Sequence, residues 1–139
     1  MSLPGKLQKI VDEFKGAPRP LKLPLLLEYA GRLPPLPPEL EGKLEQVHEC
    51  QTPLFVLAQV ADLGTVALHF DAPPEAPTTR GFAAIVSAGL SGASTQEILG
   101  TPVDFYEEMG LAELISPLRL RGLGAIVARV KRQVREQAG

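Results

Sequence analysis

Cys50 is the only cysteine in the 139-residue chain, and it directly follows His48 and Glu49. A thiolate is a strong nucleophile, so a cysteine in a polar segment is a candidate reactive residue. Because the chain has one cysteine, it has no internal disulfide and no resolving thiol within the monomer. The same count excludes a multi-cysteine zinc or iron–sulfur site built by this chain alone. Cys50 therefore acts alone or together with a partner molecule.

Two environments are open for the Cys50 side chain. Free cysteines are commonly buried and behave as small hydrophobic side chains. However, the neighbours His48, Glu49 and Gln51 are polar. They favour a loop over the core, because a core cysteine normally lies inside an apolar run such as residues 54–57. We therefore expect Cys50 in an exposed loop, just before a strand.

The ionisation of Cys50 decides its reactivity, since a free cysteine has a pKa of about 8.5 and is mostly protonated near neutral pH. His48 lies two residues earlier, and on an extended backbone a protonated imidazole there favours the thiolate. Glu49 acts in the opposite direction. A Cys–His hydrolase would also need an orienting group for the histidine and oxyanion donors, and the sequence shows neither clearly. A cysteine-dependent hydrolase or thiol transferase is the alternative from the enzyme class.

The composition limits the class of protein. Hydrophobic residues make up 45% of the chain and charged residues 22%, as in globular proteins, and 139 residues suit a single domain over 1–139. The formal net charge of −2 excludes a strongly basic nucleic-acid-binding protein. No apolar run approaches the ~20 residues that cross a bilayer, and the first residues lack a secretory signal pattern. We expect a cytoplasmic protein, in a compartment that keeps a lone thiol reduced.

Helical periodicity predicts amphipathic helices at both ends of the chain. Residues 7–14 predict a first helix that ends near Gly16, and residues 21–33 predict a second, more buried helix. The proline-rich segment 33–40 is either a stiff connector whose leucines pack on the domain or a polyproline peptide ligand. The final helix, residues 120–138, has an apolar stripe and basic residues largely outside it. The stripe consists of Leu123, Ile126, Val127, Val130 and Val134, and the basic residues are Arg129, Lys131, Arg132 and Arg135.

That basic face is either solvated or a docking surface for an acidic partner. No long apolar heptad stripe demands obligate assembly, so we expect a monomer or a weak homodimer.

The middle of the chain predicts a small sheet. Residues 54–60 and 65–70 are rich in strand-forming side chains and predict a β-hairpin. Because a single hairpin is marginal in water, we expect a third strand within residues 43–48.

Helices follow the predicted sheet. A helix is predicted over residues 78–90, and the capping-box spacing at Ser94 and the Thr101-Pro102 pair predict two short helices. The order of helices, sheet and helices predicts an α+β domain. In it, a small antiparallel three-stranded sheet packs against N-terminal and C-terminal helices.

Several segments are recognisable together. They are Val47-His48-Glu49-Cys50-Gln51-Thr52 before the hydrophobic strand, the upstream Arg32-Leu33-Pro34-Pro35-Leu36-Pro37, the central Arg80-Gly81-Phe82, and the downstream Phe105-Tyr106-Glu107-Glu108-Met109-Gly110-Leu111 and Ser116-Pro117-Leu118-Arg119-Leu120-Arg121-Gly122-Leu123. In this order and at these separations they resemble the SufE family of sulfur-acceptor proteins, over almost the whole chain. The resemblance implies a fold similar to that of the NifU-like cluster scaffold proteins.

The resemblance also implies a function and roles for individual residues. A protein of this kind accepts a persulfide sulfur on Cys50 from a SufS-type cysteine desulfurase, stimulates that enzyme, and passes the sulfur to an iron–sulfur cluster scaffold. The carrier needs no cofactor or metal of its own, whereas the desulfurase carries pyridoxal phosphate. Arg119 matches the family's late arginine and Glu107 its acidic residue in the preceding short helix, near the desulfurase interface or the cysteine loop. His48 and Gln51 flank the cysteine as supporting residues.

The chain departs from the family pattern around the cysteine and in the late motif. Glu49 stands in place of a glycine, which would let the cysteine loop swing more easily. Other departures are Thr52 for serine, Phe55 where tryptophan is common, and Leu118, Leu120 and Arg121 around Arg119. The sulfur role needs only Cys50 and survives them. A further alternative, from the interaction class, is an adaptor whose cysteine is incidental.

Overall fold

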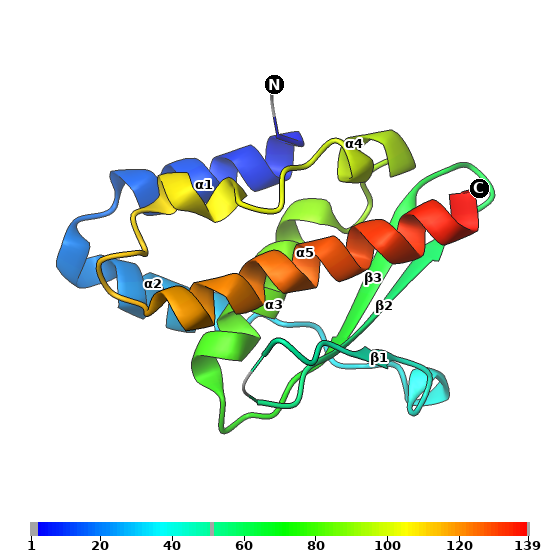
Figure 1. The fold of residues 1–139 in the computed structure, drawn as a ribbon, viewed down its shortest axis with the longest axis horizontal. Coiled ribbons are helices and arrows are strands. Elements are labelled where there is room, and N and C mark those ends of the chain that lie inside the picture. Colours follow the sequence, from blue (N-terminus) through cyan, green and yellow to red (C-terminus); the bar gives the residue numbers. More distant parts are fainter. Residues whose placement is uncertain (1–2, 51, 139) are drawn as a thin grey trace.

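The computed structural model describes residues 3–50 and 52–138. Within these ranges five α-helices and two 3-10 helices accompany a three-stranded sheet (Figure 1). In chain order the elements are α1 (Gly5–Gly16), α2 (Arg19–Ala30), η1 (Pro38–Leu40), β1 (Glu45–Gln46), β2 (Phe55–Val60), β3 (Val66–Asp71), α3 (Pro77–Leu90), α4 (Thr95–Leu99), η2 (Phe105–Met109) and α5 (Pro117–Ala138). The predicted α+β fold is confirmed, with helices before and after the three strands in chain order. In this described part of the chain no helix is long and apolar enough to cross a membrane.

The sheet is antiparallel, with strand order β1-β2-β3. The predicted hairpin is confirmed, and Leu57 pairs with His69 near its middle. Gly64 in the hairpin turn has a φ of 84°, a conformation that glycine adopts without steric cost. The third strand is also confirmed, although it is short: Glu45 pairs with Val56. Because β1 ends at Gln46, the chain can turn immediately into the segment that carries Cys50.

Strand β1 pairs only with the start of β2, and side chains of α5 bind backbone N–H and C=O groups along the rest of that edge. The Gln133 Oε1 accepts a hydrogen bond from the Ala58 backbone N–H at 2.7 Å, and its Nε2 donates to the Val56 carbonyl at 3.3 Å. One helical turn later, Gln137 accepts from the Val60 N–H at 2.9 Å and donates to the Ala58 carbonyl at 2.6 Å. A side-chain amide has the same donor and acceptor as a peptide group. The two glutamines therefore replace a neighbouring strand and fix α5 against the sheet.

The helices share one hydrophobic core with the buried face of the sheet. Figure 1 shows α5 crossing over α3 and over strands β2 and β3. The predicted stripe of α5, from Leu123 to Val134, is buried throughout. Helix α3 lies close to its neighbours at two glycines: a Cβ on Gly81 would be 2.8 Å from the Leu26 carbonyl oxygen, and one on Gly89 would be 2.7 Å from the Leu7 Cδ1. The contact at Gly81 therefore holds the N-terminal half of α3 against α2, and the contact at Gly89 holds its C-terminal end against α1.

Two predicted helix boundaries are wrong, and each has a local cause. The Thr101-Pro102 pair does not begin a helix, because the Thr101 hydroxyl donates a hydrogen bond back to the Glu97 carbonyl at 2.8 Å, at the end of α4. The next helix, η2, begins only at Phe105. Helix α5 begins before the predicted residue 120, because the Ser116 hydroxyl accepts a hydrogen bond from the Arg119 N–H at 3.3 Å and caps the first turn.

Other local predictions hold. The capping box at Ser94 is present in full. In the proline-rich segment, Leu33 and Leu40 are buried, so the segment is a connector that packs on the domain.

Candidate functional site

Cys50 lines a pocket of about 200 Å³ between three parts of the chain. One wall is the first two turns of α3, which contribute Thr79 and Phe82, and another is the start of α5, which contributes Leu118 and Arg119. Two helix N-termini therefore meet at the pocket, and helix N-termini favour negative charge nearby. The pocket lining combines apolar side chains with one cationic side chain, Arg119, and one thiol, Cys50.

The Cys50 side chain is half-buried, which differs from the predicted exposed position. Its Sγ lies 3.9 Å from the Gly122 carbonyl oxygen, within reach of the weak hydrogen bond that a neutral thiol donates. A Cβ on Gly122 would lie 3.3 Å from this sulfur, so a glycine in α5 lets the thiol approach the helix closely. Cys50 also packs against the edge of the hydrophobic core. The loop position is confirmed, but the sulfur points inward.

Burial dominates the ionisation of Cys50. Burial first, and the Glu49 carboxylate second, raise the pKa of the Cys50 thiol to about 11, while the Arg129 guanidinium lowers it. The nearby positive charge therefore comes from Arg129 and not, as the sequence suggested, from His48. At neutral pH the thiol is almost entirely protonated, so the site protects Cys50 rather than activating it.

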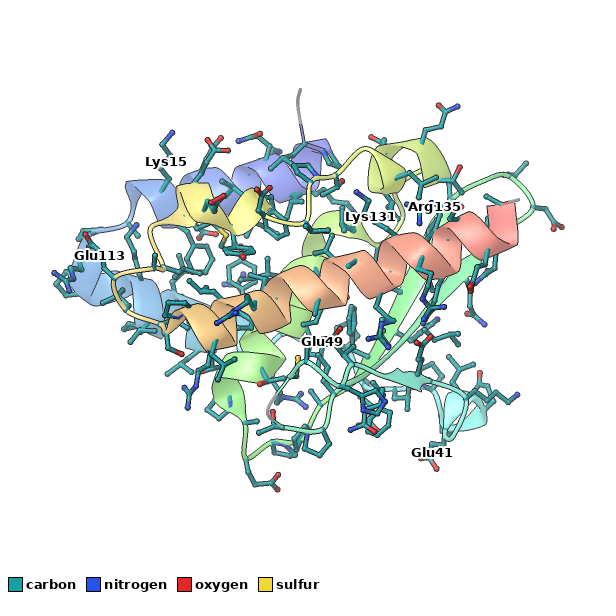
Figure 2. The ribbon with its side chains drawn as sticks, in the orientation of Figure 1. Lys15, Glu41, Glu49, Glu113, Lys131 and Arg135 are labelled. Atoms are coloured by element: carbon teal, nitrogen blue, oxygen red, sulfur yellow. The ribbon has the colours of Figure 1, made fainter. Side chains whose placement is uncertain are left out.

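Arg129, from the middle of α5, binds both β1 and the segment before Cys50. Its Nη1 donates to the Glu45 carboxylate at 2.8 Å and to the Gln46 carbonyl at 2.9 Å, and its Nη2 donates to Glu49 Oε1 at 2.8 Å. The Glu45 carboxylate also accepts hydrogen bonds from Arg132 and Gln133. Figure 2 shows Glu49 beside the middle of α5. Sequence reasoning missed Arg129, because the residue looked like one of several basic side chains on a solvated face.

The basic residues of α5 do not form one solvated face. Arg129 and Arg132 pair with Glu45 on the side of β1. Lys131 points to the other side, where its Nζ donates to the Thr101 carbonyl at 2.7 Å. In Figure 2 Lys131 and Arg135 lie across the helix from Glu49. Arg129, Lys131 and Arg132 therefore bind groups of this chain, which weakens the case for a basic docking surface on α5.

The structure brings together only part of the predicted site. Arg119 lines the same pocket as Cys50, and its side chain is exposed there. His48 is exposed on the segment before Cys50, and Glu107 is exposed on η2; neither is among the described residues that line the pocket. Gln51 lies outside the described residues. Thr52 is joined to α3 through its hydroxyl, 2.9 Å from the Thr79 hydroxyl.

Among the residues that the structure describes, no cluster of metal-binding side chains accompanies Cys50. In these ranges no group of three or more His, Cys, Asp or Glu side chains is placed to hold a metal ion. The chemically distinctive group is the Cys50 thiol, which lines the same pocket as Arg119 and directly follows Glu49, the ion-pair partner of Arg129.

Comparison with known proteins gives a consistent result. The family model described as "SufE: Fe-S metabolism associated domain" matches residues 8–134. An uncharacterized SufE-like protein of Mycobacterium tuberculosis is 54% identical over 136 residues, which cover 97% of this chain and 95% of that protein. The sulfur acceptor protein CsdE of Escherichia coli is 28% identical over 102 residues, 73% of this chain and 68% of CsdE.

A solved structure is similar in fold as well as in sequence. The solution structure of a hypothetical protein from Thermus thermophilus has a TM-score of 0.88 and 47% sequence identity, and the match covers 99% of this chain and 98% of that one. The family match spans both the Cys50 segment and the start of α5, which together form the pocket. The chain therefore belongs to the SufE family.

Proposed function

We propose that this protein is a sulfur carrier that accepts a sulfane sulfur on Cys50 from a cysteine desulfurase and delivers it for iron–sulfur cluster assembly. The observation that carries the proposal is the position of the chain's one cysteine: Cys50 is half-buried in a pocket that Arg119 also lines. A carrier must bind its sulfur where solvent thiols and oxidants reach it poorly. Membership of the SufE family and the likeness to the sulfur acceptor CsdE support this role.

The transfer step requires no change in overall oxidation state. The Cys50 sulfur attacks the terminal sulfur of a persulfide on the desulfurase, a new S–S bond forms at Cys50, and the original S–S bond breaks. The desulfurase cysteine leaves as a thiolate and takes up the proton that Cys50 loses. Cys50 then holds the sulfur as Cys–S–S⁻. In delivery, a thiol of the acceptor loses its proton as it attacks this terminal sulfur in the same way, and Cys50 takes up that proton as it is released as a thiol.

The neutral resting state of Cys50 suits a carrier that reacts only when docked. A thiol with a pKa of about 11 is a poor nucleophile toward small electrophiles in solution at neutral pH. Docking to a partner must therefore bring Cys50 out of its pocket or supply a base for its proton. A persulfide anion in the pocket would lie near Arg119 and two helix N-termini, which favour negative charge.

The partners in this proposal rest on membership of the SufE family and the likeness to CsdE. The donor is a cysteine desulfurase of the SufS type, which supplies the persulfide and carries pyridoxal phosphate, and the acceptor is an iron–sulfur scaffold. The carrier itself uses no cofactor. We place Arg119 at the docking surface, because its exposed side chain lies on the pocket that opens beside Cys50.

A hydrolase or thiol transferase acting without a partner fits the site less well. Such an enzyme needs an activated thiolate and an oriented base. In this protein the pKa of Cys50 is raised instead, and the exposed His48 does not line the pocket.

Desulfurase turnover distinguishes these functions. The protein, the Cys50→Ser variant and the Arg119→Ala variant are each added to a SufS-type desulfurase with cysteine, and alanine release is measured. We expect stimulation by the parent protein, none by Cys50→Ser, and weaker stimulation by Arg119→Ala. Equal stimulation by Cys50→Ser would contradict sulfur acceptance and favour an adaptor whose cysteine is incidental. Turnover of a thioester or disulfide substrate without any desulfurase would favour the enzyme alternative.

A further inference from the structure

The segment before Cys50 is attached to α5 by the ion pair between Glu49 and Arg129, two residues that are 80 positions apart in the sequence. We name residues 47–50 the Cys50 loop. Within it, the Val47 N–H donates to the Leu54 carbonyl at 2.8 Å, and the Cys50 N–H donates to the Val47 carbonyl at 3.2 Å. Backbone hydrogen bonds therefore hold Val47, the first residue of the loop. From there Glu49 points to α5, where its Oε1 lies 2.8 Å from the Arg129 Nη2.

Arg129 is held more firmly than its partner. Its side chain is 17% exposed, whereas that of Glu49 is 55% exposed. The other half of the guanidinium group is fixed by the Glu45 carboxylate and the Gln46 carbonyl. A planar guanidinium can bind several acceptors in a fixed geometry, which a lysine ammonium cannot do as well. Arg129 therefore keeps bonds to Glu45 and Gln46 when its bond to Glu49 breaks, and Glu49 is the partner that is free to separate.

We propose that Arg129 is a positioning residue that holds the Cys50 loop against α5 through Glu49, so that Cys50 stays turned into its pocket until this ion pair opens. The Glu49–Arg129 pair and the contact of Cys50 Sγ with the Gly122 carbonyl lie on adjacent residues of the loop. Releasing Glu49 therefore frees the backbone next to the sulfur. The importance of this restraint for sulfur delivery rests on the proposed function, but the restraint itself does not.

Arg129 has two effects on Cys50 reactivity, and they have opposite signs. As a positive charge, it stabilises the thiolate and speeds alkylation. As a restraint, it keeps the sulfur half-buried and slows alkylation. The other charged groups near Cys50 are Glu49, which opposes the thiolate, and Arg119, which lines the pocket. Burial is the largest contribution to the raised pKa of Cys50. We therefore expect the restraint, which keeps the sulfur buried, to affect the alkylation rate more than the charge of Arg129 does.

Alkylation of Cys50 by iodoacetamide at neutral pH, without any desulfurase, separates the two effects. Since Cys50 is the only cysteine, every alkylated molecule reports on it. In the parent chain, Arg129→Gln should react about two- to five-fold faster, the range that the loss of an ion pair with an exposed partner allows. In a Glu49→Gln background the restraint is already lost, so the same substitution should slow the reaction.

Arg132→Gln is the matched control. Arg132 lies on the same helix and also binds Glu45, but its ion pairs are with Glu45 and Glu136 rather than with Glu49. It should leave the alkylation rate within about 1.5-fold of the parent rate, since the ion pair of Glu49 is intact. Raising the salt concentration should speed alkylation of the parent and have a smaller effect on Arg129→Gln.

The sign of the effect decides the proposal. Slower or unchanged alkylation of Arg129→Gln in the parent chain would show that Arg129 acts only as a charge and would overturn the restraint. Arg129→Gln should stay folded, because Glu45 keeps Arg132 and Gln133 as partners when Arg129 is replaced. If Arg129→Gln unfolds nevertheless, Glu49→Gln tests the other end of the pair, and a parent-like alkylation rate in that variant would overturn the proposal.

Discussion

Raising the pH should ionise Cys50 only well above the range of an ordinary thiol. Burial and the Glu49 carboxylate raise the Cys50 pKa to about 11, although the Arg129 guanidinium lowers it. At about pH 8, an ordinary cysteine with a pKa of about 8.5 is about 24% thiolate, whereas a thiol with a pKa of about 11 is about 0.1% thiolate. The folded protein should therefore alkylate on the order of 100-fold more slowly than its own unfolded chain at this pH.

The assay is the rate of iodoacetamide alkylation from about pH 7 to about pH 11, measured on the native protein and on the chain unfolded in urea. The unfolded chain is the control, because it contains the same single thiol without burial. We expect the unfolded rate to level off above a midpoint at about 8.5, whereas the native rate should still be rising at about pH 11, the pKa of the folded thiol. A native midpoint at the unfolded value would refute the inward position of the sulfur.

The same difference in pKa predicts a loss of stability in alkaline solution. The folded pKa of Cys50 lies above the unfolded value, so the protonated thiol stabilises the folded state below about pH 8.5. This contribution is lost as the pH rises toward about 11. In a Cys50→Ser variant the substituted hydroxyl does not ionise in this window, so the variant should lose less stability across it than the parent does. Equal losses in urea-unfolding measurements of the two proteins would contradict the linkage.

Three substitutions test the pocket and the packing that supports it. Arg119→Ala should slow sulfur acceptance from a persulfidated desulfurase but change the free energy of unfolding by less than about 0.5 kcal/mol, because its side chain is exposed. An unchanged acceptance rate would remove Arg119 from the site. Gln133→Leu should cost about 1–3 kcal/mol in urea unfolding, because the Ala58 N–H loses its partner. A neutral effect would mean that α5 does not seal the strand edge. Gly81→Ala should lower the thermal midpoint and cost about 1–3 kcal/mol, since the new Cβ would lie 2.8 Å from the Leu26 carbonyl oxygen. A midpoint equal to that of the parent would contradict the close approach of α2 and α3.

Local patterns were sufficient to predict most of the fold. The hairpin around Gly64, the capping box at Ser94 and the buried stripe of α5 each depend on residues close together in sequence. Such signals can be read directly from side-chain spacing. Thr101 shows the limit of this approach, because the same hydroxyl can cap the next helix or bind the previous one. In the structure it binds the Glu97 carbonyl, which the spacing alone does not decide.

The candidate site was harder to predict because it depends on distant residues. Cys50 could be identified from its polar neighbours, but its burial depends on Gly122, 72 residues later. The partner of Glu49 is Arg129, 80 residues away on a different element. In the sequence Arg129 cannot be distinguished from Lys131, which lies on the other side of α5 and donates to the Thr101 carbonyl. Only the packing of α5 against β1 distinguishes the two.

Intact-protein mass spectrometry tests the central claim most directly. The protein is incubated with a SufS-type cysteine desulfurase and cysteine, and its mass is measured before and after treatment with a reductant. We expect a gain of one sulfur atom, located at Cys50, that the reductant removes, and no such gain in Cys50→Ser. If the desulfurase turns over and the mass of the parent protein stays unchanged, Cys50 is not a sulfur acceptor and the proposed function is wrong.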